Sequence, residues 1–289
     1  MLKKKRNIIA LTALLLISVG TITANLWLPI SPSLINPDQR LLPPSVTNWF
    51  GTDDFGRDIF SRTVVAARVS LAVGLIVAII ATVLGVLIGL VSGYYRKADF
   101  LIMRIIDGFL AFPALLLALA LVASLGGSLT NIIIALTIAL FPVVARVVRS
   151  AVLQVSHIQY IEAAKTTGTG DFVILMKYIL PNVLSPIIVQ GTFIFAKAIL
   201  AEAALSFLGV GIDPSIPTWG NMLQESQIYI TIAPWFSFFP GLAIIVTVLA
   251  LNILGDGLRD IFDPHSRSDK KTKKKRKLTF KRIKGDYAA

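Results

Sequence analysis

The chain has 289 residues, of which 55% are hydrophobic and only 15% are charged, and its mean hydropathy is +0.76. This composition excludes an ordinary soluble domain and predicts an all-α polytopic membrane protein. The formal net charge is +12, but the basic residues cluster where apolar stretches end, which indicates membrane topology rather than nucleic-acid binding. The sequence has no cysteine and only two distant histidines, His157 and His265, so we expect no metal site.

The chain opens with a basic segment, residues 1–6, followed by a mostly apolar stretch, residues 7–28. A secretory signal peptide begins in the same way. The apolar run is long enough to span a bilayer, and Ala24-Asn25-Leu26 is a poor cleavage site. We therefore expect a cytoplasmic N-terminus and a retained first anchor.

Residues 29–69 are polar and rich in proline, and we expect them outside the membrane because irregular backbone finds no hydrogen-bond partners in lipid. Gly51 and Gly56 predict tight turns. The charged side chains that follow can pair locally at helical spacing. They are Asp53, Asp54, Arg57, Asp58 and Arg62. We interpret this segment as a structural cap on the outer face, with direct substrate contact as the alternative.

Five further apolar stretches bring the expected number of transmembrane helices to about six. In one of them Gly85, Gly89 and Gly93 lie four residues apart, which predicts close approach of another helix. Pro113 and Pro142 interrupt two others, and Pro113 predicts a kink. The expected spans are residues 70–94, 100–123, 131–149, 183–208 and 236–257.

Three charged residues within these spans are candidates for a translocation path, because an unpaired charge in the bilayer costs several kcal/mol. They are Asp107, Lys197 and Glu202. Asp107 can pair with Arg104, three residues earlier. Lys197 and Glu202 lie five residues apart and are poorly placed to pair with each other. The alternative for Glu202 is hydration near the outer interface.

Between the last two spans the chain leaves the membrane. We expect residues 223–234 to form an outer loop with a re-entrant or interfacial piece, and Trp219, Tyr229 and Trp235 to lie at the membrane interface. Residues 266–289 are dense in lysine and predict a basic cytoplasmic tail attracted to anionic lipid headgroups.

The distribution of basic residues predicts the orientation. Of the 28 Lys and Arg residues, the expected spans place 23 on one side: four in residues 1–6, three in 96–104, four in 146–177 and twelve from 259 onward. Four lie on the other side, and Lys197 lies within a span. The positive-inside rule therefore puts both termini and residues 157–181 in the cytoplasm.

Residues 157–181 form the longest polar-punctuated piece in the middle of this apolar chain. The segment predicts two short helices joined at residues 168–170, the second opening at Asp171 as its N-cap. Pro181 closes the second helix or starts the next element. The spacing of four apolar residues predicts one shared face. They are Phe172, Leu175, Met176 and Ile179.

This stretch resembles the EAA loop of permease subunits of bacterial ATP-binding-cassette (ABC) importers. The family pattern is Glu-Ala-Ala, three residues, Gly, nine residues, Ile, any residue, Leu-Pro. The residues in register are Glu162, Ala163, Ala164, Gly168, Leu180 and Pro181. Tyr178 occupies the Ile position, which is a departure. The resemblance implies a cytoplasmic coupling helix, here including Asp171, that docks on an ATPase subunit. The alternative is an ordinary amphipathic linker.

A second resemblance covers about residues 45–265. The segment Gly51-Thr52-Asp53, with Gly56-Arg57-Asp58, is similar to the start of the C-type permease of dipeptide, oligopeptide and nickel importers, and residues 205–220 are similar to a later motif. The resemblance implies a type I ABC importer permease fold in the bacterial cytoplasmic membrane, with residues 70–265 as its core. It also implies a B-type permease, two ABC ATPases and an extracytoplasmic solute-binding protein as partners.

The chain has no glycine-rich phosphate-binding loop, so we expect it to be no enzyme and to bind no cofactor, with ATP and Mg²⁺ held by the partner ATPases. Peptides are the expected cargo, and nickel or another metal chelate is the alternative. A secondary transporter is a competing class. An intramembrane enzyme is a third, weakened because the spans lack a plausible catalytic set.

Overall fold

The computed structural model describes residues 2–262, with side chains from residue 5, so the basic tail expected at 266–289 lies outside the described residues. The predicted all-α architecture is confirmed: the described chain has no strand beyond an isolated bridge between Thr52 and Asp58. In chain order the helices are α1 (Leu2–Ile22), α2 (Ala24–Trp27), α3 (Ile59–Tyr94), α4 (Arg96–Leu110), α5 (Ala114–Leu125), α6 (Leu129–Val155), α7 (Gln159–Thr166), α8 (Asp171–Val173), α9 (Leu180–Phe207), α10 (Trp219–Ser226) and α11 (Pro234–Phe262), with 3-10 turns at Pro37–Gln39 and Gln227–Tyr229 and a π-helix at Ile174–Ile179.

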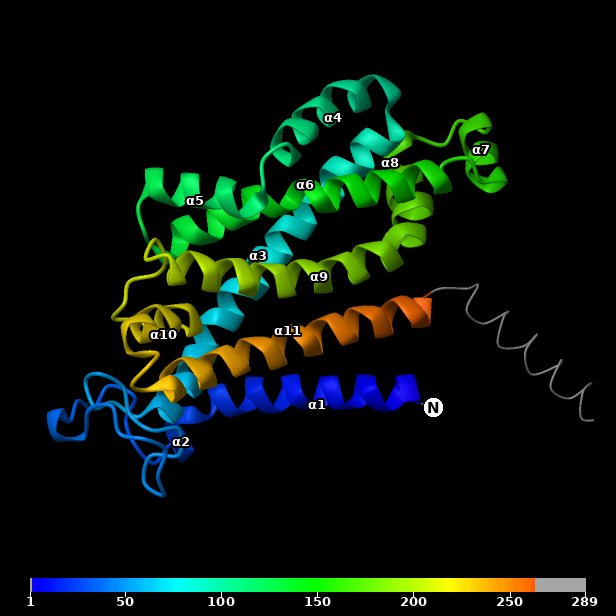
Figure 1. Cartoon of the computed structure of the whole chain (residues 1–289). Helices are drawn as coiled ribbons and strands as arrows, with labels where there is room; N and C mark the ends of the chain where they lie inside the picture. Colours follow the sequence, from blue (N-terminus) through cyan, green and yellow to red (C-terminus); the bar gives the residue numbers. More distant parts are fainter. Residues whose placement is uncertain (1, 263–289) are drawn as a thin grey trace, which may run out of the picture.

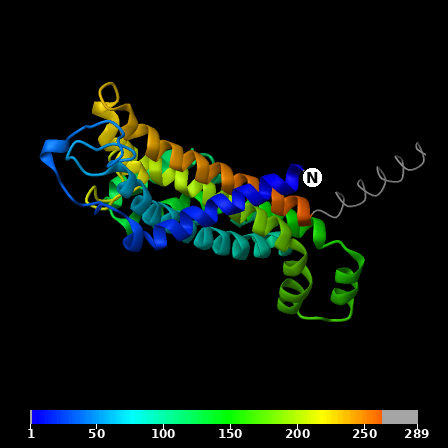
Figure 2. The ribbon, with the colours of Figure 1, turned by 90° about the horizontal axis from the view of Figure 1, so that it is seen from below.

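Helices α1, α11, α9, α6 and α5 lie side by side in this order, and α3 crosses behind them, packing mainly on α6 and α9 (Figure 1). One end of the bundle carries the loops of residues 29–58 together with α10, and we call it the motif end. The opposite end carries the start of α1, the end of α11 and the hairpin of residues 157–181, and we call it the hairpin end. The hairpin projects from the bundle there (Figure 2).

Five helices are long and apolar enough to cross a membrane, and the number is six if α4 and α5 form one broken span. We expected a single kinked helix at 100–123, but α4 and α5 meet at a bend of 83°. Pro113 causes this break because it cannot donate to the preceding turn, and α5 begins at the next residue. The 12 residues of α5 reach only about 18 Å, too short to span a bilayer alone.

Helix α3 begins at Ile59, eleven residues before the span expected at 70–94. Asp58 caps it, since its Oδ2 accepts a hydrogen bond from the Ser61 amide at 2.8 Å. The first turns carry polar side chains, which hid them from a search for apolar runs, yet Arg62 is only 3% exposed. The 36 residues of α3 reach about 54 Å, from the motif end to the hairpin end.

The glycine stripe of α3 brings another helix close, as predicted. Gly85, Gly89 and Gly93 face Val144, Val148 and Val152 of α6, respectively. A Cβ atom at any of these glycines would lie 2.5–2.7 Å from the facing valine Cβ. The α3–α6 contact is the most extensive between any two described helices. Because glycine has no side chain, this face of α3 lets the α6 backbone approach closely.

Candidate functional site

The hairpin begins with α7, which ends in a glycine cap. The Thr169 amide donates to the Ala164 carbonyl and the Gly168 amide to the Lys165 carbonyl, both at 3.1 Å, which is the Schellman pattern. Gly168 has φ +79, a conformation that favours glycine. The expected joint at residues 168–170 is therefore a built helix cap that turns the chain toward α8.

The second arm differs from the expectation at Asp171. Gly170 is the N-cap, and Asp171 is the first helical residue and makes no capping bond. Its Oδ1 instead accepts a hydrogen bond from the Tyr94 hydroxyl at 2.7 Å, at the end of α3. The Nζ of Lys165 lies 4.7 Å from the centre of the same Tyr94 ring.

The second arm does not end at Pro181. It continues through the π-helix of residues 174–179 into α9, and Pro181 lies in the first turn of α9. Proline cannot donate to the preceding turn, and the wider π-turns directly before it accommodate that loss. Asn182 Nδ2 donates to the Tyr178 carbonyl at 2.6 Å, so a side chain supplies a hydrogen bond there.

The hairpin turns an apolar face inward and leaves a mixed face exposed. Five apolar residues pack into the main core of the bundle, and they are Ile161, Ala164, Ile174, Leu175 and Ile179. Phe172 is 73% exposed, so the face predicted to combine it with Leu175, Met176 and Ile179 is wrong. The π-turns change the angular spacing between residue 172 and those that follow.

The residues that match the EAA pattern are divided between the two arms. Glu162 and Ala163 are exposed on α7, and Glu162 Oε1 lies 3.7 Å from His157 Nδ1. Leu180 and Pro181 start α9, with Leu180 half-buried and Pro181 exposed. The structure thus gathers the pattern into one projecting element, in which Glu162, Ala163 and Pro181 are exposed and Ala164 is buried.

At the motif end, Asp53 organises a buried loop. The Asp53 side chain is fully buried, and its Oδ1 accepts hydrogen bonds from the amides of Phe55 at 2.8 Å and Arg57 at 2.9 Å. Asp53 Oδ2 receives Arg57 Nε at 2.6 Å and Arg62 Nη1 at 3.2 Å. The predicted tight turns are present, because Gly51 and Gly56 both have positive φ.

Glu225 of α10 completes this cluster and was missed in the sequence. Its Oε2 lies 3.1 Å from Arg57 Nη2 and 3.0 Å from Arg62 Nη2. The predicted local pairing of Asp53 with Arg57 is present, and Glu225 adds ion pairs that span more than 160 residues of chain. One signal could have found it, since Glu225 is the only charged residue between Asp213 and Asp256.

Two other members of the outer motif have structural contacts rather than ion pairs. Asp58 caps α3. Thr52 is fully buried, and its hydroxyl donates to the Gln39 carbonyl at 2.5 Å and accepts from the Leu42 amide at 2.8 Å. These contacts hold the motif together as a compact loop, and Asp58 fixes the start of α3.

The carboxylates of Asp53, Asp54 and Glu225 come close enough together for a cation. Arg57 and Arg62 already supply positive charge to this group, so the donor set does not fit a metal ion. Burial raises the pKa of Glu225 above its usual range, and the two guanidinium groups oppose that shift. Burial and Asp53 raise the pKa of Asp54.

Glu202 of α9 is fully buried, so the alternative of a hydrated side chain is wrong. Its Oε1 accepts from the Ser206 hydroxyl at 2.9 Å and its Oε2 from the Ser70 hydroxyl of α3 at 3.2 Å, and Thr218 adds a third hydroxyl. Ser70 Oγ also accepts from the Trp219 amide at 3.3 Å. Glu202 therefore joins α3 and α9 to the start of α10.

Trp219 does not lie at an interface as expected, because its side chain is only 1% exposed. Its Nε1 donates to the Thr63 carbonyl at 2.9 Å, so the indole is held inside the motif end. The expected loop at 223–234 contains the end of α10 and a 3-10 turn. Helix α10 thus links the cluster around Glu202, at its N-terminal end, to the cluster around Glu225, near its C-terminal end.

The other two candidate charges lie apart from Glu202. Lys197 is exposed on α9 and has no hydrogen-bond or ion-pair partner among the described residues. Asp107 pairs with Arg146 of α6 at 2.5 Å instead of Arg104, whose guanidinium stacks 5.1 Å from the Phe100 ring. The three residues therefore do not form one site.

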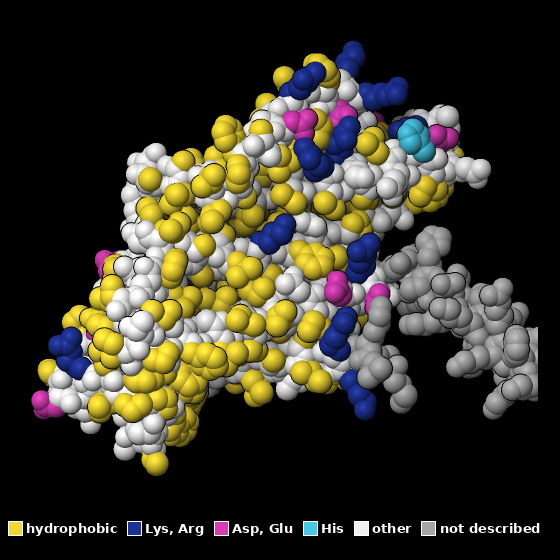
Figure 3. Space-filling model, viewed as in Figure 1, with side chains coloured by type: hydrophobic (Ala, Val, Ile, Leu, Met, Phe, Trp, Pro, Cys, Tyr) yellow, Lys and Arg dark blue, Asp and Glu magenta, His cyan; other side chains and the backbone are white. Residues whose placement is uncertain are grey.

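The surface shown in Figure 3 is mostly apolar along the middle of the bundle, and most of its basic side chains lie toward the hairpin end.

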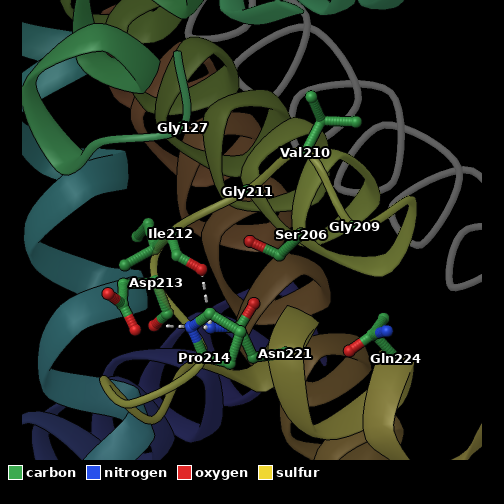
Figure 4. A pocket seen from close by; sticks show the side chains of 10 residues that line it. All are labelled: Gly127, Ser206, Gly209, Val210, Gly211, Ile212, Asp213, Pro214, Asn221 and Gln224. Atoms are coloured by element: carbon green, nitrogen blue, oxygen red, sulfur yellow. Dashed lines mark hydrogen bonds between the residues drawn. The ribbon is translucent and has the colours of Figure 1, made fainter.

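A cavity of about 370 Å³ opens at the motif end between the loop after α5, the end of α9 and α10. Figure 4 shows Asn221 at its base, donating through Nδ2 to the carbonyls of Ile212 at 3.1 Å and Asp213 at 3.3 Å. Ser206 and Gln224 also line it. The cavity is polar, and Asn221 fixes the loop that forms its wall.

Comparison with known proteins agrees with this architecture. Residues 81–268 match the family described as binding-protein-dependent transport system inner membrane component. The chain is 47% identical over 268 residues to the dipeptide transport system permease protein DppC of Alkalihalophilus pseudofirmus, covering 91% of this chain and 88% of that one. It is 49% identical over 236 residues to the probable peptide ABC transporter permease protein y4tQ of Sinorhizobium fredii, covering 82% and 81%. It is 44% identical over 265 residues to the glutathione transport system permease protein GsiD of Escherichia coli, covering 90% and 88%.

Proposed function

This chain belongs to the family of binding-protein-dependent transport system inner membrane components, and we propose that it forms half of a heterodimeric pore for ATP-driven import of peptides. It is a multi-pass inner-membrane protein and the permease component of an ABC transporter. The observation that carries the proposal is the exposed hairpin of residues 157–181, at the opposite end of α3 from the buried motif. A second permease, two ABC ATPases and an extracytoplasmic binding protein are the proposed partners, with ATP and Mg²⁺ on the ATPases.

The proposed orientation puts the hairpin end in the cytoplasm. Arg96, Arg149 and Lys177 belong to this end, together with both described chain ends. The four basic residues of 40–68 belong to the motif end. The bias of basic residues toward one end follows the positive-inside rule. The hairpin then lies where ATP is available.

We assign docking on the ATPase to the exposed hairpin surface. Glu162 and Ala163 offer a polar and a small side chain on α7, and Phe172 offers an apolar one on the other arm. The Gly168 cap and the Leu180-Pro181 start of α9 keep the arms in register, and Asp171 ties them to α3. ATP binding would draw two such hairpins together and rock the spans between inward-open and outward-open states.

Lys197 is the strongest candidate for the translocation path. An exposed, unpaired lysine near the middle of a membrane helix is costly against lipid, so its face is expected to meet water or the second permease. Glu202 is assigned a supporting role, because its carboxyl is enclosed by hydroxyl groups. Asp107 is the weakest candidate, since it is exposed and paired with Arg146.

The names of three relatives support peptides as cargo, including one that transports dipeptides and one that transports glutathione. A nickel or other metal chelate is the alternative cargo for the same machinery. Family membership favours an ABC importer over a secondary transporter. ATP dependence of uptake in vesicles separates these two classes.

The test is ATPase activity of the copurified complex in lipid nanodiscs, with the binding protein added empty, peptide-loaded or chelate-loaded. We expect stimulation by the peptide-loaded form. Stimulation by the chelate-loaded form alone would move the cargo to metal chelates. If no ATPase copurifies with the chain, the importer proposal is wrong.

Variants of the hairpin test the assignment of its residues. We expect Glu162→Ala to reduce peptide uptake and stimulated ATPase activity at least about tenfold while the chain still inserts, because a buried charge-assisted contact contributes about 1.5–3 kcal/mol. Lys177→Ala is the matched control, as an exposed charge on the other arm that lies outside the EAA pattern. Equal activity of Glu162→Ala and the native chain would contradict the docking assignment.

A further inference from the structure

Tyr94 occupies a distinctive position in the chain. It is the last residue of α3, the helix that begins at the Asp58 cap of the motif end. Helix α9 also connects the two ends of the bundle, because it continues the second arm of the hairpin and reaches α10, but α3 is the helix that begins within the buried motif itself. A displacement of the motif end along or across α3 therefore reaches the hairpin at Tyr94.

Both arms of the hairpin contact this one side chain. The Tyr94 hydroxyl donates to Asp171 Oδ1 at 2.7 Å on the second arm, and Lys165 of α7 places its Nζ 4.7 Å from the ring centre. The Tyr94–Asp171 bond joins the hairpin of residues 157–181 to the end of α3, and the neighbouring Tyr95 hydroxyl also interacts with Asp171. The Tyr95 ring packs edge-on against Tyr94 at 4.9 Å.

The last turn of α3, which carries Tyr94, is packed tightly against α6. Gly93 packs against α6, where an added Cβ would lie 2.6 Å from Val152 Cβ. Ser92 and Gly93 are both buried. The backbone that carries the Tyr94 side chain is therefore held in place against α6.

We propose that Tyr94 is a positioning residue that grips both arms of the hairpin and sets its angle against α3, so that a change at the motif end alters the hairpin presented to the ATPase. This inference rests on the proposed coupling role of the hairpin. Asp171 is the acceptor of the grip and Lys165 its second contact. The hairpin arms also pack on each other, so loss of the grip changes their angle and leaves the hairpin folded.

The first experiment uses Tyr94→Phe in the full complex in nanodiscs, with its binding protein and a dipeptide as cargo. Phenylalanine keeps the ring under Lys165 and removes only the hydroxyl. We expect the ATPase subunits to copurify as before, and stimulation by the loaded binding protein to fall roughly three- to tenfold, the effect of one solvent-exposed hydrogen bond. Unchanged stimulation would overturn the proposal.

The matched control is Tyr178→Phe, on the second arm of the hairpin. The Tyr178 hydroxyl has no hydrogen-bond partner among the described residues, and its ring contact with Tyr160 survives the change. We expect stimulation to stay at the native level. An equal loss in both variants would show a general sensitivity of the hairpin and would overturn the assignment to Tyr94.

A double-mutant cycle separates the grip from a general structural role. If the hydroxyl acts through Asp171, Tyr94→Phe has no further effect on stimulation in an Asp171→Ala background. Multiplication of the two losses would mean that Tyr94 acts elsewhere, and the proposal would fail. The native complex in the same assay tests the proposed function separately. If the loaded binding protein does not stimulate the native complex, the proposed function fails, whereas a failure confined to the variants contradicts only the role of Tyr94.

A distance measurement reads the angle directly. This chain has no cysteine, so spin labels at Lys97→Cys and Thr166→Cys are the only ones that it carries. We expect Tyr94→Phe to shift or broaden the distance distribution between α4 and α7. An unchanged distribution would overturn the positioning role even if ATPase stimulation fell.

Discussion

The two ends of α3 hold charged residues in opposite ways. At the motif end, Arg62 is buried and pairs with the buried carboxylate of Asp53 and, across the fold, with Glu225. At the hairpin end, Glu162 is 59% exposed in its side chain, and the bond between Tyr94 and Asp171 lies at the surface. Buried charges have to be paired inside the molecule, whereas exposed ones stay available to a partner. One end is thus fixed by its own contacts, and the other is the end that we propose a second protein completes.

The largest expected effect is at the motif end. Arg62→Met removes a guanidinium that is 3% exposed and leaves Asp53 and Glu225 with only Arg57 between them. We expect the free energy of unfolding to fall by about 3 kcal/mol and Tm by about 10 °C, since breaking a buried pair leaves an uncompensated charge. Intrinsic tryptophan fluorescence of the purified chain measures Tm.

Arg68→Met is its control on the same helix, because Arg68 is exposed and donates one bond, to the Ile22 carbonyl at 3.2 Å. We expect a loss below about 1 kcal/mol for this variant. Comparable losses in the two variants would mean that the motif end is no more rigid than the surface.

A smaller effect comes from the same substitution made at each end. Gly220→Ala places a Cβ 2.6 Å from Ser206 Cβ and 2.8 Å from the Ala203 backbone, which forces α10 away from α9 and costs about 1–3 kcal/mol. Gly170→Ala meets nothing within 4 Å and keeps an ordinary φ of −62, and the entropy that it removes from the unfolded chain offsets the weaker N-cap, so we expect a change below about 1 kcal/mol. Thermal unfolding compares the two variants, and equal costs would contradict the contrast between the ends.

The smallest effect is on pH dependence at Glu225. Burial raises the pKa of this carboxyl, while Arg62 and Arg57 oppose the shift and Asp53 and Asp54 support it. Because the folded pKa exceeds the unfolded one, the folded chain binds the proton more tightly. The stability contributed by this carboxyl rises as pH falls through the folded pKa and is complete below the unfolded value.

The measurement is the difference in Tm between the native chain and Glu225→Gln at pH 7.5 and pH 5, both chosen as test conditions around the usual carboxyl range of about 4–5. We expect the difference to shift in favour of the native chain at the lower pH by a few degrees at most. A shift in the opposite direction would mean that the two arginines outweigh burial.

The sequence by itself determined the class, the approximate positions of the spans and the position of the hairpin. The hydropathy of a stretch depends only on its own residues, so composition and apolar runs were enough to predict an all-α membrane protein. The four-residue spacing of Gly85, Gly89 and Gly93 sufficed for a close helix contact, because both follow from helical periodicity. The EAA spacing located the hairpin, and a glycine at its turn was explained by the cap geometry of Gly168.

Only the tertiary structure decided which charges meet. Glu225 lies far from Arg57 and Arg62 in sequence, Asp171 accepts from Tyr94 instead of capping its own helix, and Asp107 pairs with Arg146 instead of Arg104. A side chain's partner depends on the rotation and crossing of whole helices, which local spacing does not encode. The 83° break at Pro113 and the early start of α3 arise in the same way, because packing against neighbouring segments decides how far a helix continues.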